Sequence, residues 1–572
     1  MVTYSAREKE RRGNYIVTEK RTPPHRVMVI GLDCGTFDII KPWIAEGHLP
    51  NLARLLHAGS HGILNSTVPT ISPAAWTSFM TGKNPGKHGV FDFFQRKKDG
   101  YDVFIVRNNL PALGTIFRYL SEAGYRVGVF NVPMTYPPEE VNGFMVSGLG
   151  APDNHRYTYP SALVEQLKAQ NYTINNPPFT PETAEEFYDQ LVDNTRIRAE
   201  AMLRLLHQEP WDFFMAVFRD IDTIEAFYWH YMDPTHPLYN PKASDKLKNA
   251  ILNYHIQIDG IIGEMLDAFG EGITFVISDH GGGPLHKEVY VNNWLAQEGF
   301  LTTKQGREAK DTFLQSLRRI GITRESITKA IGWSAVDWLK SRLPLSMRTW
   351  VPWENPNLVE MVDWPRTKAY SFGHIGQIFI NLQGREPQGV VAPGIEYQQV
   401  VGEIVKRLRQ LKDPETGEPA VTKIYLRDEL YHGPYIESAP DINVIFQDMR
   451  YLVHIGTEFA HTDIFGPSVN FETGTHRIDG MLLAHGQPIR PQQENRQPYE
   501  LVDLAPTIYY LMGLPIPVDM DGNVIEEILK ESFLSSHKMT ETEPFSKEGE
   551  LTPWNESEEQ EVAQRLRDLG YL

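Results

Sequence analysis

Three apolar segments of this 572-residue chain each run into an aspartate. They have the composition of buried strands and lie at 26–32, 213–218 and 273–278. Helical patterns rather than hairpin turns separate the strands, which predicts right-handed crossovers and a parallel sheet. The carboxyl ends of such strands share one edge of the sheet, where Asp33, Asp222 and Asp279 would meet. Because buried carboxylates are costly unless paired or metal-bound, the pattern predicts a functional site at that edge.

The composition excludes several classes of protein. Acidic residues outnumber basic ones, 73 to 55, and give a net charge of −18. A general nucleic-acid binder needs a basic surface, so we expect no specific nucleic-acid binding. The single cysteine, Cys34, excludes an intrachain disulfide and a cysteine-rich zinc site. The charged N-terminus and the lack of a run of about 18 apolar residues predict no signal peptide, no membrane span and a cytoplasmic location.

Ser72 and two histidines extend the predicted site. Ser72 follows Asp33 in a proline-flanked turn ahead of a helix-like run at 74–80, where a hydroxyl can face an anion at the helix N-terminus. His280 follows the third strand, and His476 lies on a glycine-flanked loop. Carboxylates and imidazoles suit Zn, Mn or Fe. Two such metals roughly 4 Å apart would clamp the oxygens of an in-line displacement at phosphorus, and one would activate the Ser72 hydroxyl.

The stretches RVMVIGLDCGTFD, VPTISPAAWTSFMTG, KHGVFDFF and GTHRIDG resemble the alkaline phosphatase superfamily. The resemblance is closest to the type I phosphodiesterase/nucleotide pyrophosphatase branch and extends over about residues 26–527. It implies a doubly wound α/β domain with a mostly parallel sheet between helices. It also implies hydrolysis of a phosphomonoester, phosphodiester, pyrophosphate or sulfate ester, or phosphate transfer as in mutases.

The same resemblance assigns roles to the site residues. It implies two divalent metal ions, Zn or Mn. The first would be held by Asp33, Ser72, Asp279 and His280. The second would be held by Asp222, at the start of an Asp-x-x-x-His motif, and by His476. The nucleophile of the branch falls on Ser72, with Thr70 as the alternative register.

Two features depart from the branch. The Asp-x-x-x-His motif ends in Ala226, so its second metal ligand is missing and we expect a weak or empty second metal site. The conceivable substitutes are Glu225, Asp220, His454, His461 and His485, whereas His230 lies a full turn beyond Ala226, too far from Asp222 to share a metal. Nucleotide pyrophosphatases usually carry an Asn just after the HG segment, and this Asn holds a phosphate oxygen. The corresponding place in this sequence reads Phe91-Asp92-Phe93, which argues against nucleotide pyrophosphatase activity in particular. Ser72-Pro-Ala-Ala-Trp lacks the Arg of the sulfatase motif, which argues against sulfate esters.

These observations predict a metal-dependent phosphoester hydrolase, most simply a phosphodiesterase, that forms a phospho-serine on Ser72. The substrate would be a small phosphorylated molecule, with Asn131, Thr135 and Arg477 as candidate contacts. The loss at Ala226 leaves open a weakened family member that binds a phosphorylated ligand or partner. A phosphotransferase or mutase is the third possibility. The sequence leaves the oligomeric state undetermined.

The predicted domain organisation has four parts. A polar N-terminal arm covers 1–25, and the catalytic domain covers 26–300 and 366–530. A tryptophan-rich cap or lid is inserted at 301–365. An acidic tail covers 531–572 and carries a terminal helix at about 558–569.

Overall fold

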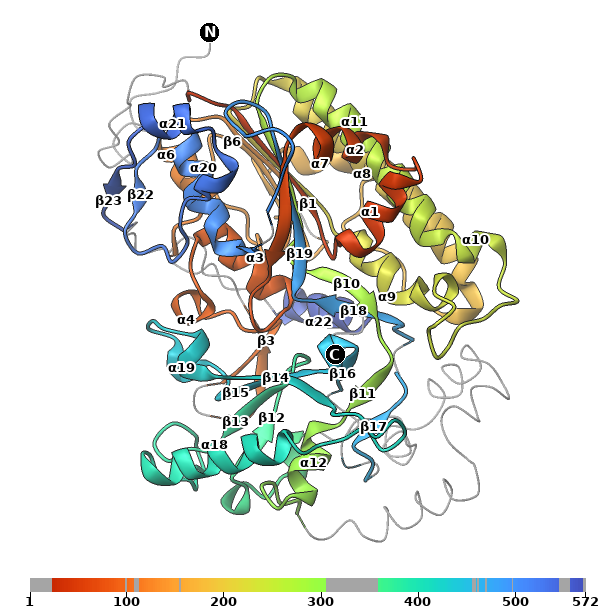
Figure 1. The fold of residues 1–572 in the computed structure, drawn as a ribbon, viewed down its shortest axis with the longest axis vertical. Helices are drawn as coiled ribbons and strands as arrows, with labels where there is room; N and C mark the ends of the chain where they lie inside the picture. Colours follow the sequence, from red (N-terminus) through yellow and green to blue (C-terminus); the bar gives the residue numbers. More distant parts are fainter. Residues whose placement is uncertain are drawn as a thin grey trace.

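The computed structural model places one large sheet between helices in the upper part of the molecule (Figure 1). It describes residues 23–97, 100–106, 113–153, 156–304, 358–454, 459, 462–468, 471–495, 497–544 and 556–568. In this part of the chain the large sheet has ten strands in the order β20-β2-β19-β9-β1-β8-β5-β6-β7, with β21 beside β2. The strands are β1 (Val27–Leu32), β2 (Ser60–Asn65), β5 (Val127–Val132), β6 (Gly143–Ser147), β7 (Thr158–Tyr159), β8 (Phe213–Phe218), β9 (Ile273–Ile277), β19 (Asp479–His485), β20 (Gln493–Glu494) and β21 (Tyr499–Glu500).

The register of β1 against its neighbours brings the strand ends together. β1 is parallel to both β8 and β9, with Leu32 opposite Phe218 and Gly31 opposite Ile277. The aspartates that follow these strands therefore reach the same edge of the sheet, and the predicted parallel arrangement is confirmed. β19 departs from it, because this strand runs antiparallel between β2 and β9.

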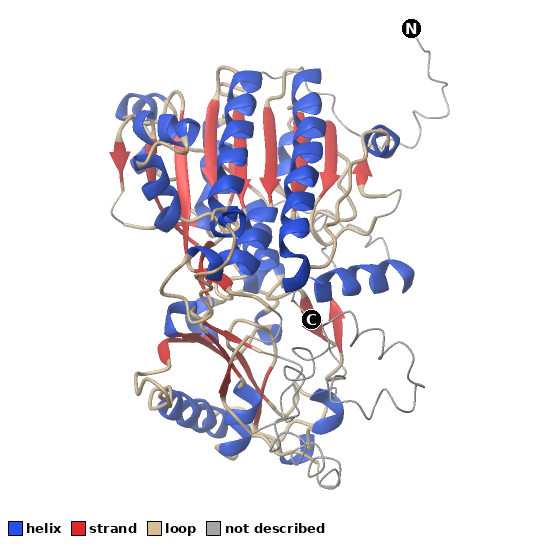
Figure 2. Cartoon of the chain, turned by 90° about the vertical axis from the view of Figure 1, so that its right-hand side faces the viewer, coloured by secondary structure: helices blue, strands red, loops and turns tan. Residues whose placement is uncertain are grey.

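Helices cover both faces of the large sheet, which confirms the doubly wound α/β fold (Figures 1 and 2). Side chains alternate along a strand, so Met28 and Ile30 pack under one helical layer, and Val27 and Val29 under the other. The first layer contains α1 (Phe37–Ala45), α2 (Pro50–Ala58), α7 (Leu163–Lys168), α8 (Ala184–Gln208), α9 (Asp220–Met232), α10 (Asp245–Lys248) and α11 (Ala250–Phe269). The second contains α3 (Ser72–Thr81), α6 (Ile116–Glu122), α20 (Leu504–Leu511) and α21 (Glu531–Ser536).

Some predicted elements differ in detail from the structure. The predicted helix 39–59 is two helices, because Gly47 has a φ of +85° and Pro50 starts the second one. The predicted helix 244–269 is likewise divided into α10 and α11. The predicted loop 81–89 contains a short helix, α4 (Pro85–His88).

A smaller antiparallel sheet lies beyond the edge that carries the aspartates (Figure 1). Its four strands, in the order β12-β13-β15-β14, are β12 (Ala369–Ser371), β13 (Gln377–Ile380), β15 (Ile442–Phe446) and β14 (Val421–Leu426). With α12 (Val291–Gln297) and α18 (Ile395–Leu408), this sheet encloses its own apolar core. Two short pairings link it to the large sheet: β10 (Gly281–Pro284) with β18 (Gly474–Arg477), and β11 (Lys287–Val289) with β16 (Tyr451–Val453) and β17 (Phe465–Gly466).

Apart from the 13-residue helix α22, the other described elements are short. They are β3 (Phe94–Arg96), β4 (Val103–Ile105), β22 (Ile516–Pro517), β23 (Glu541–Thr542), α17 (Leu358–Met361), α19 (Arg427–Leu430) and α22 (Glu556–Asp568). Single 3-10 turns lie at Pro181–Thr183, Trp364–Arg366, Ile436–Ser438, Gln447–Met449, Leu501–Asp503 and Glu526–Ile528. Most of the predicted arm and cap, and part of the tail, lie outside the described residues, so those boundaries stay predictions. Within the described chain, no helix has the length and apolar character needed to cross a membrane.

The C-terminal helix α22 folds back onto the loops that follow β5 and β6. Val562 and Leu566 are buried there, and Tyr136 donates a hydrogen bond of 2.8 Å to Glu558. Arg565 donates to the carbonyl oxygen of Ala151. The predicted terminal helix is thus present, and it is packed on the body of the protein.

Glu139, in the loop between β5 and β6, is a buried carboxyl group away from the aspartate edge. It accepts a hydrogen bond from Thr115, whose side chain also caps α6. Among the described residues its other oxygen, Oε1, has no hydrogen-bond partner. Burial raises the pKa of Glu139 from 4.5 to about 7.

We expect Glu139→Gln to stabilise the protein at pH 8 and to have little effect near pH 4.5. The folded state holds this proton between the unfolded pKa of 4.5 and the folded pKa of about 7, so wild-type stability falls as the pH rises through that window. The loss amounts to roughly 3 kcal/mol above pH 7. Urea unfolding at both pH values measures it, with the exposed neighbour Glu140→Gln as control. An equal effect at both pH values would contradict the titration.

Candidate active site

Four predicted site residues meet at the carboxyl edge of the large sheet. Ser72 Oγ lies 3.4 Å from Asp33 Oδ1 and 3.2 Å from His280 Nε2. His280 Nε2 is in turn 3.3 Å from Asp279 Oδ2 and 3.7 Å from Asp33 Oδ1. The ligand atoms of Asp33, Asp279 and His280 all lie within 4.8 Å of one another, a spacing that suits one cation.

Local structure fixes the direction of the serine and its neighbours. Ser72 is the first residue of α3, every residue of which is buried. One turn later, Trp76 Nε1 donates a 3.3 Å hydrogen bond to Asp33 Oδ2. The Trp76 ring fits because residue 31 is glycine. A Cβ atom added to Gly31 would lie 2.6 Å from the Trp76 ring. Thr70, the alternative register, donates its hydroxyl proton to the carbonyl oxygen of Thr67 instead.

Asp222 and His476 lie directly beside this group. His476 Nδ1 donates to the carbonyl oxygen of Thr70 at 2.9 Å, which leaves Nε2 facing Asp222 Oδ1 at 3.5 Å. The rings of His476 and His280 stack with their centroids 3.8 Å apart. His280 Nδ1 lies 3.3 Å from the carbonyl oxygen of Gly281, so its Nε2 is the nitrogen left for a ligand. The six predicted catalytic and metal-binding residues thus form one continuous group.

The electrostatics of this group favour a bound cation. Burial and the charges of Asp279 and Asp222 raise the pKa of Asp33 well above its ordinary value. Burial raises the pKa of Asp279 to about 7 and lowers that of His280. Burial also opposes the charged form of His476, but the hydrogen bond and charge of Asp222 raise its pKa overall. Asp279 Oδ2 has no hydrogen-bond partner among the described residues. Crowded carboxylates beside the neutral imidazole of His280 form a donor set that a divalent cation would stabilise.

A pocket opens beside these residues, between the large sheet and the smaller one. Its described lining is Asp33, Ile71, Leu149, Arg219, Asp222, Thr223, Ala226, Phe227, His374, Ile375, Leu452, Glu472, Gly474, Thr475 and His476. The apolar walls and the few charged groups are typical of a small-molecule site. His374 and Ile375 come from the loop between β12 and β13, so the smaller sheet contributes to the pocket.

Arg219 is a functional candidate that the sequence interpretation missed. Its side chain is 9% exposed, and among the described lining residues it is the one Lys or Arg. Its Nε lies 3.2 Å from Asp220 Oδ1, and Nη2 donates to the carbonyl oxygen of Ile174. Nη1 has no hydrogen-bond partner among the described residues. Asp220 also pairs with Arg198, so the three groups together carry excess positive charge. The sequence contained one indication of this role, because Arg219 directly follows strand β8 at the edge where the aspartates gather.

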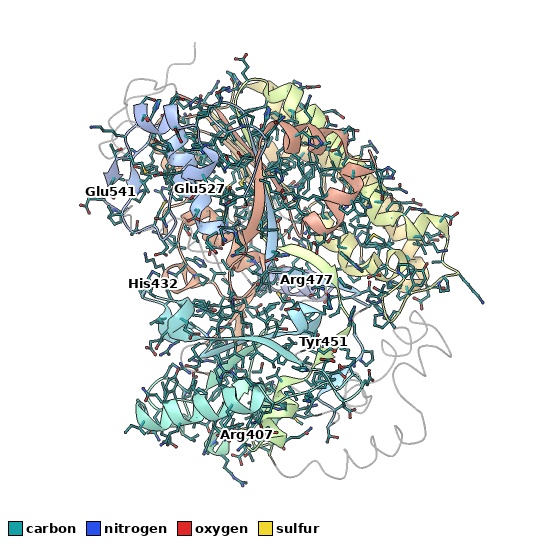
Figure 3. The ribbon with its side chains drawn as sticks, viewed as in Figure 1. Arg407, His432, Tyr451, Arg477, Glu527 and Glu541 are labelled. Carbon is teal, nitrogen blue, oxygen red and sulfur yellow. The ribbon has the colours of Figure 1, made fainter. Side chains whose placement is uncertain are left out.

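The three predicted substrate contacts are not among the described lining residues of this pocket. Asn131 lines a neighbouring cavity with Arg219 and accepts a hydrogen bond from Tyr172. Thr135 is fully buried and donates to the carbonyl oxygen of Val132. Arg477, at the junction of the two sheets, donates to backbone carbonyl oxygens of β10 and β18 (Figure 3). Thr135 and Arg477 thus bind backbone here, and a direct substrate contact stays a prediction.

Most of the described candidates for the histidine missing at Ala226 have contacts away from the pair of Asp222 and His476, whereas Glu225 is buried near Asp222, and burial and that charge raise its pKa. Asp220 is paired with two arginines, His230 bonds to Thr473, and His454 lies 3.2 Å from Glu288. His485 pairs with Thr274, near the opposite end of β9. Glu225 enters the space above Gly282, where an added Cβ would lie 1.9 Å from its Oε2. His461 lies outside the described residues.

A doubly wound sheet whose strand ends gather carboxylates, imidazoles and a serine at a helix N-terminus defines a hydrolase of the alkaline phosphatase-like class. The family model of the type I phosphodiesterase / nucleotide pyrophosphatase matches residues 27–458. The chain therefore belongs to this family, and it is a phosphoric ester hydrolase. The resemblance inferred from the sequence is confirmed.

Solved structures to which the chain is similar include two ectonucleotide pyrophosphatases/phosphodiesterases 5. The human protein is 12% identical, with a TM-score of 0.45, and the match covers 88% of this chain and 100% of that chain. The murine protein, solved as an inactive variant in complex with AMP, is 11% identical with a TM-score of 0.48 and the same coverage, 88% and 100%. No curated protein matches the sequence.

Proposed function

We propose that the protein is a metal-dependent phosphodiesterase in which Ser72 is the nucleophile. The observation that carries the proposal is the position of Ser72 Oγ, 3.2 Å from His280 Nε2 and 3.4 Å from Asp33 Oδ1, at the start of α3. Asp33, Asp279 and His280 would hold one divalent cation, and Asp222 and His476 would contribute to a second. Such cations, when bound, would lower the pKa of the serine hydroxyl. They would also stabilise the negative charge on a phosphoryl oxygen of the substrate.

The residues of the chain position and complete the reaction. Trp76 holds Asp33 in place. A backbone N–H group at the start of α3 can donate a hydrogen bond to a phosphoryl oxygen. As the bond from Ser72 Oγ to phosphorus forms, the bond to the leaving alcohol breaks, and the alcohol takes up the proton lost from the serine. Water then breaks the phospho-serine bond and restores the hydroxyl. The products are an alcohol and a phosphate monoester.

Ala226 supports a second candidate, a weakened family member that binds a phosphorylated ligand. Protein purified without chelator should be assayed with bis(4-nitrophenyl) phosphate, 4-nitrophenyl phosphate and a diester in the presence of glycerol. Faster release from the diester than from the monoester supports the phosphodiesterase. Phosphoryl transfer to glycerol at the expense of hydrolysis favours a phosphotransferase. A ligand-dependent rise in melting temperature without any turnover favours the binding protein.

Arg219 is expected to bind an anionic oxygen of the substrate. Arg219→Met should lower kcat/KM roughly 10- to 100-fold, mainly through KM, because a charged hydrogen bond into the pocket is lost. Steady-state kinetics with the diester measure the effect. Arg196→Met, which changes an arginine with 55% side-chain exposure, is the matched control. Unchanged kinetics in the Arg219 variant would show that its guanidinium serves only Asp220 and the backbone.

A further inference from the structure

The loop that follows β6 forms a thin wall between the pocket and the C-terminal helix α22. Leu149 of this loop lines the pocket beside Arg219. The next residue, Gly150, lines another cavity together with Val562 and Leu566 of α22. Gly150 has a φ of +94°, a backbone conformation that glycine adopts readily, and it turns the chain between the two sides. The loop thus has the pocket on one side and α22 on the other.

Polar contacts also join α22 to this loop. Arg565 donates to the carbonyl oxygen of Ala151, and Glu561 accepts a 2.6 Å hydrogen bond from the backbone N of Asp153. Glu561 and Arg565 are themselves joined by a 3.0 Å hydrogen bond. These two residues and the two apolar residues in the cavity recur at three- and four-residue intervals, so they share one face of the helix. One face of α22 therefore holds the loop at several points.

The groups that carry the chemistry lie on other elements. Ser72 begins α3, and Asp33 and Asp279 come after β1 and β9. Leu149 belongs instead to the apolar part of the pocket lining, with Ile71, Phe227, Ile375 and Leu452. Apolar lining contacts the organic part of a ligand, while the few charged groups fix its orientation. Displacement of α22 would therefore alter the wall that meets the organic group and leave the reacting groups in place.

We propose that α22 is a positioning element of the substrate pocket, which holds Leu149 in the pocket wall and thereby sets the affinity for esters with an apolar organic group. This inference rests on the proposed phosphodiesterase function. Val562, Arg565 and Leu566 act through the loop and not by touching the substrate. Because coupling between two binding events is reciprocal, an ester bound in the pocket should also strengthen the docking of α22.

The first test is the kinetics of full-length variants with bis(4-nitrophenyl) phosphate. Val562→Asp combined with Leu566→Asp places two charges in a mostly apolar cavity and should undock α22. KM should rise roughly 10-fold, the size expected for a lost apolar contact, while kcat changes little. Gln560→Ala, at an exposed position of the same helix, should behave as wild type. Metal content and melting temperature check that the catalytic body is intact.

A milder pair of variants separates positioning from stability. Arg565→Met removes the hydrogen bond to Ala151 and should raise KM roughly 3- to 10-fold. Arg565→Lys keeps a charged donor at this position and should bring KM back toward the wild-type value. A role in stability alone would lower the melting temperature of these variants without any change in KM, and this result would overturn the proposal.

Hydrogen exchange measures the docking of α22 directly. The amides of Glu556–Asp568 should exchange faster in the double aspartate variant than in wild type. In Ser72→Ala protein, which leaves the probe intact, saturation with bis(4-nitrophenyl) phosphate should slow the exchange of the same amides. Exchange that the ester does not change would contradict the coupling between the pocket and the helix.

The remaining outcomes also decide the question. Undocked α22 with an unchanged KM would overturn the inference, and so would unchanged exchange in the double variant. If the double variant does not fold, the two Arg565 variants decide alone. Calorimetric titration of Ser72→Ala protein with the same ester requires no turnover. Weaker binding after the α22 substitutions, without hydrolysis by wild type, defeats only the proposed function. Hydrolysis with the same KM in every α22 variant defeats only this inference.

Discussion

Ser72→Ala is expected to abolish diester hydrolysis, by roughly 10⁴-fold or more, while metal content is unchanged. The hydroxyl is the one group at the start of α3 that can form the phospho-serine, and Asp33, Asp279 and His280 remain as ligands. Release of 4-nitrophenol from bis(4-nitrophenyl) phosphate measures turnover, and elemental analysis measures the metal.

Thr70→Ala is the matched control for the register of the nucleophile. The Thr70 hydroxyl donates to the Thr67 carbonyl oxygen, so its removal should change turnover little. Retained turnover in the Ser72 variant, with loss in the Thr70 variant, would move the nucleophile to Thr70. Retained turnover in both would defeat a hydroxyl nucleophile in this turn.

Metal removal is expected to abolish activity and to destabilise the protein more at pH 8 than at pH 6. Burial raises the pKa of Asp279 from 3.8 to about 7. The metal-free folded state therefore binds more protons than the unfolded state between these values, and its stability falls as the pH rises through that window. Above it the crowded carboxylates are charged, and a cation relieves their repulsion. A ligand at 100 times its Kd adds about 2.7 kcal/mol of stability.

Melting temperatures with and without Mn²⁺ at the two pH values measure this linkage. Asp279→Asn should remove most of the metal-dependent shift, because one ligand and one charge are lost. Asp193→Asn, at a side chain with 68% exposure, should behave as wild type. A metal-dependent shift that is independent of pH would contradict the proposed role of the buried carboxylates.

The strand ends could be predicted from sequence because their evidence is local. The apolar runs β1, β8 and β9 and the aspartates after them fix the parallel edge, and Ser72 follows from the proline-flanked turn. The directions of side chains could not be predicted in the same way. Glu225 precedes Ala226 in the chain, yet its carboxylate turns into the space left by Gly282. Glu472 is far away in sequence and reaches the pocket only because Gly474 packs on α9.

The position of β19 has a consequence for how this protein is made. β19 (Asp479–His485) lies between β2 and β9 and joins two parts of the large sheet. While the ribosome is still making the middle of the chain, β2 and β9 have no strand between them, and β9 presents an open edge. Unpaired strand edges invite association with other chains. Nascent or prematurely terminated chains that end before residue 479 should therefore be prone to aggregation and depend on chaperones.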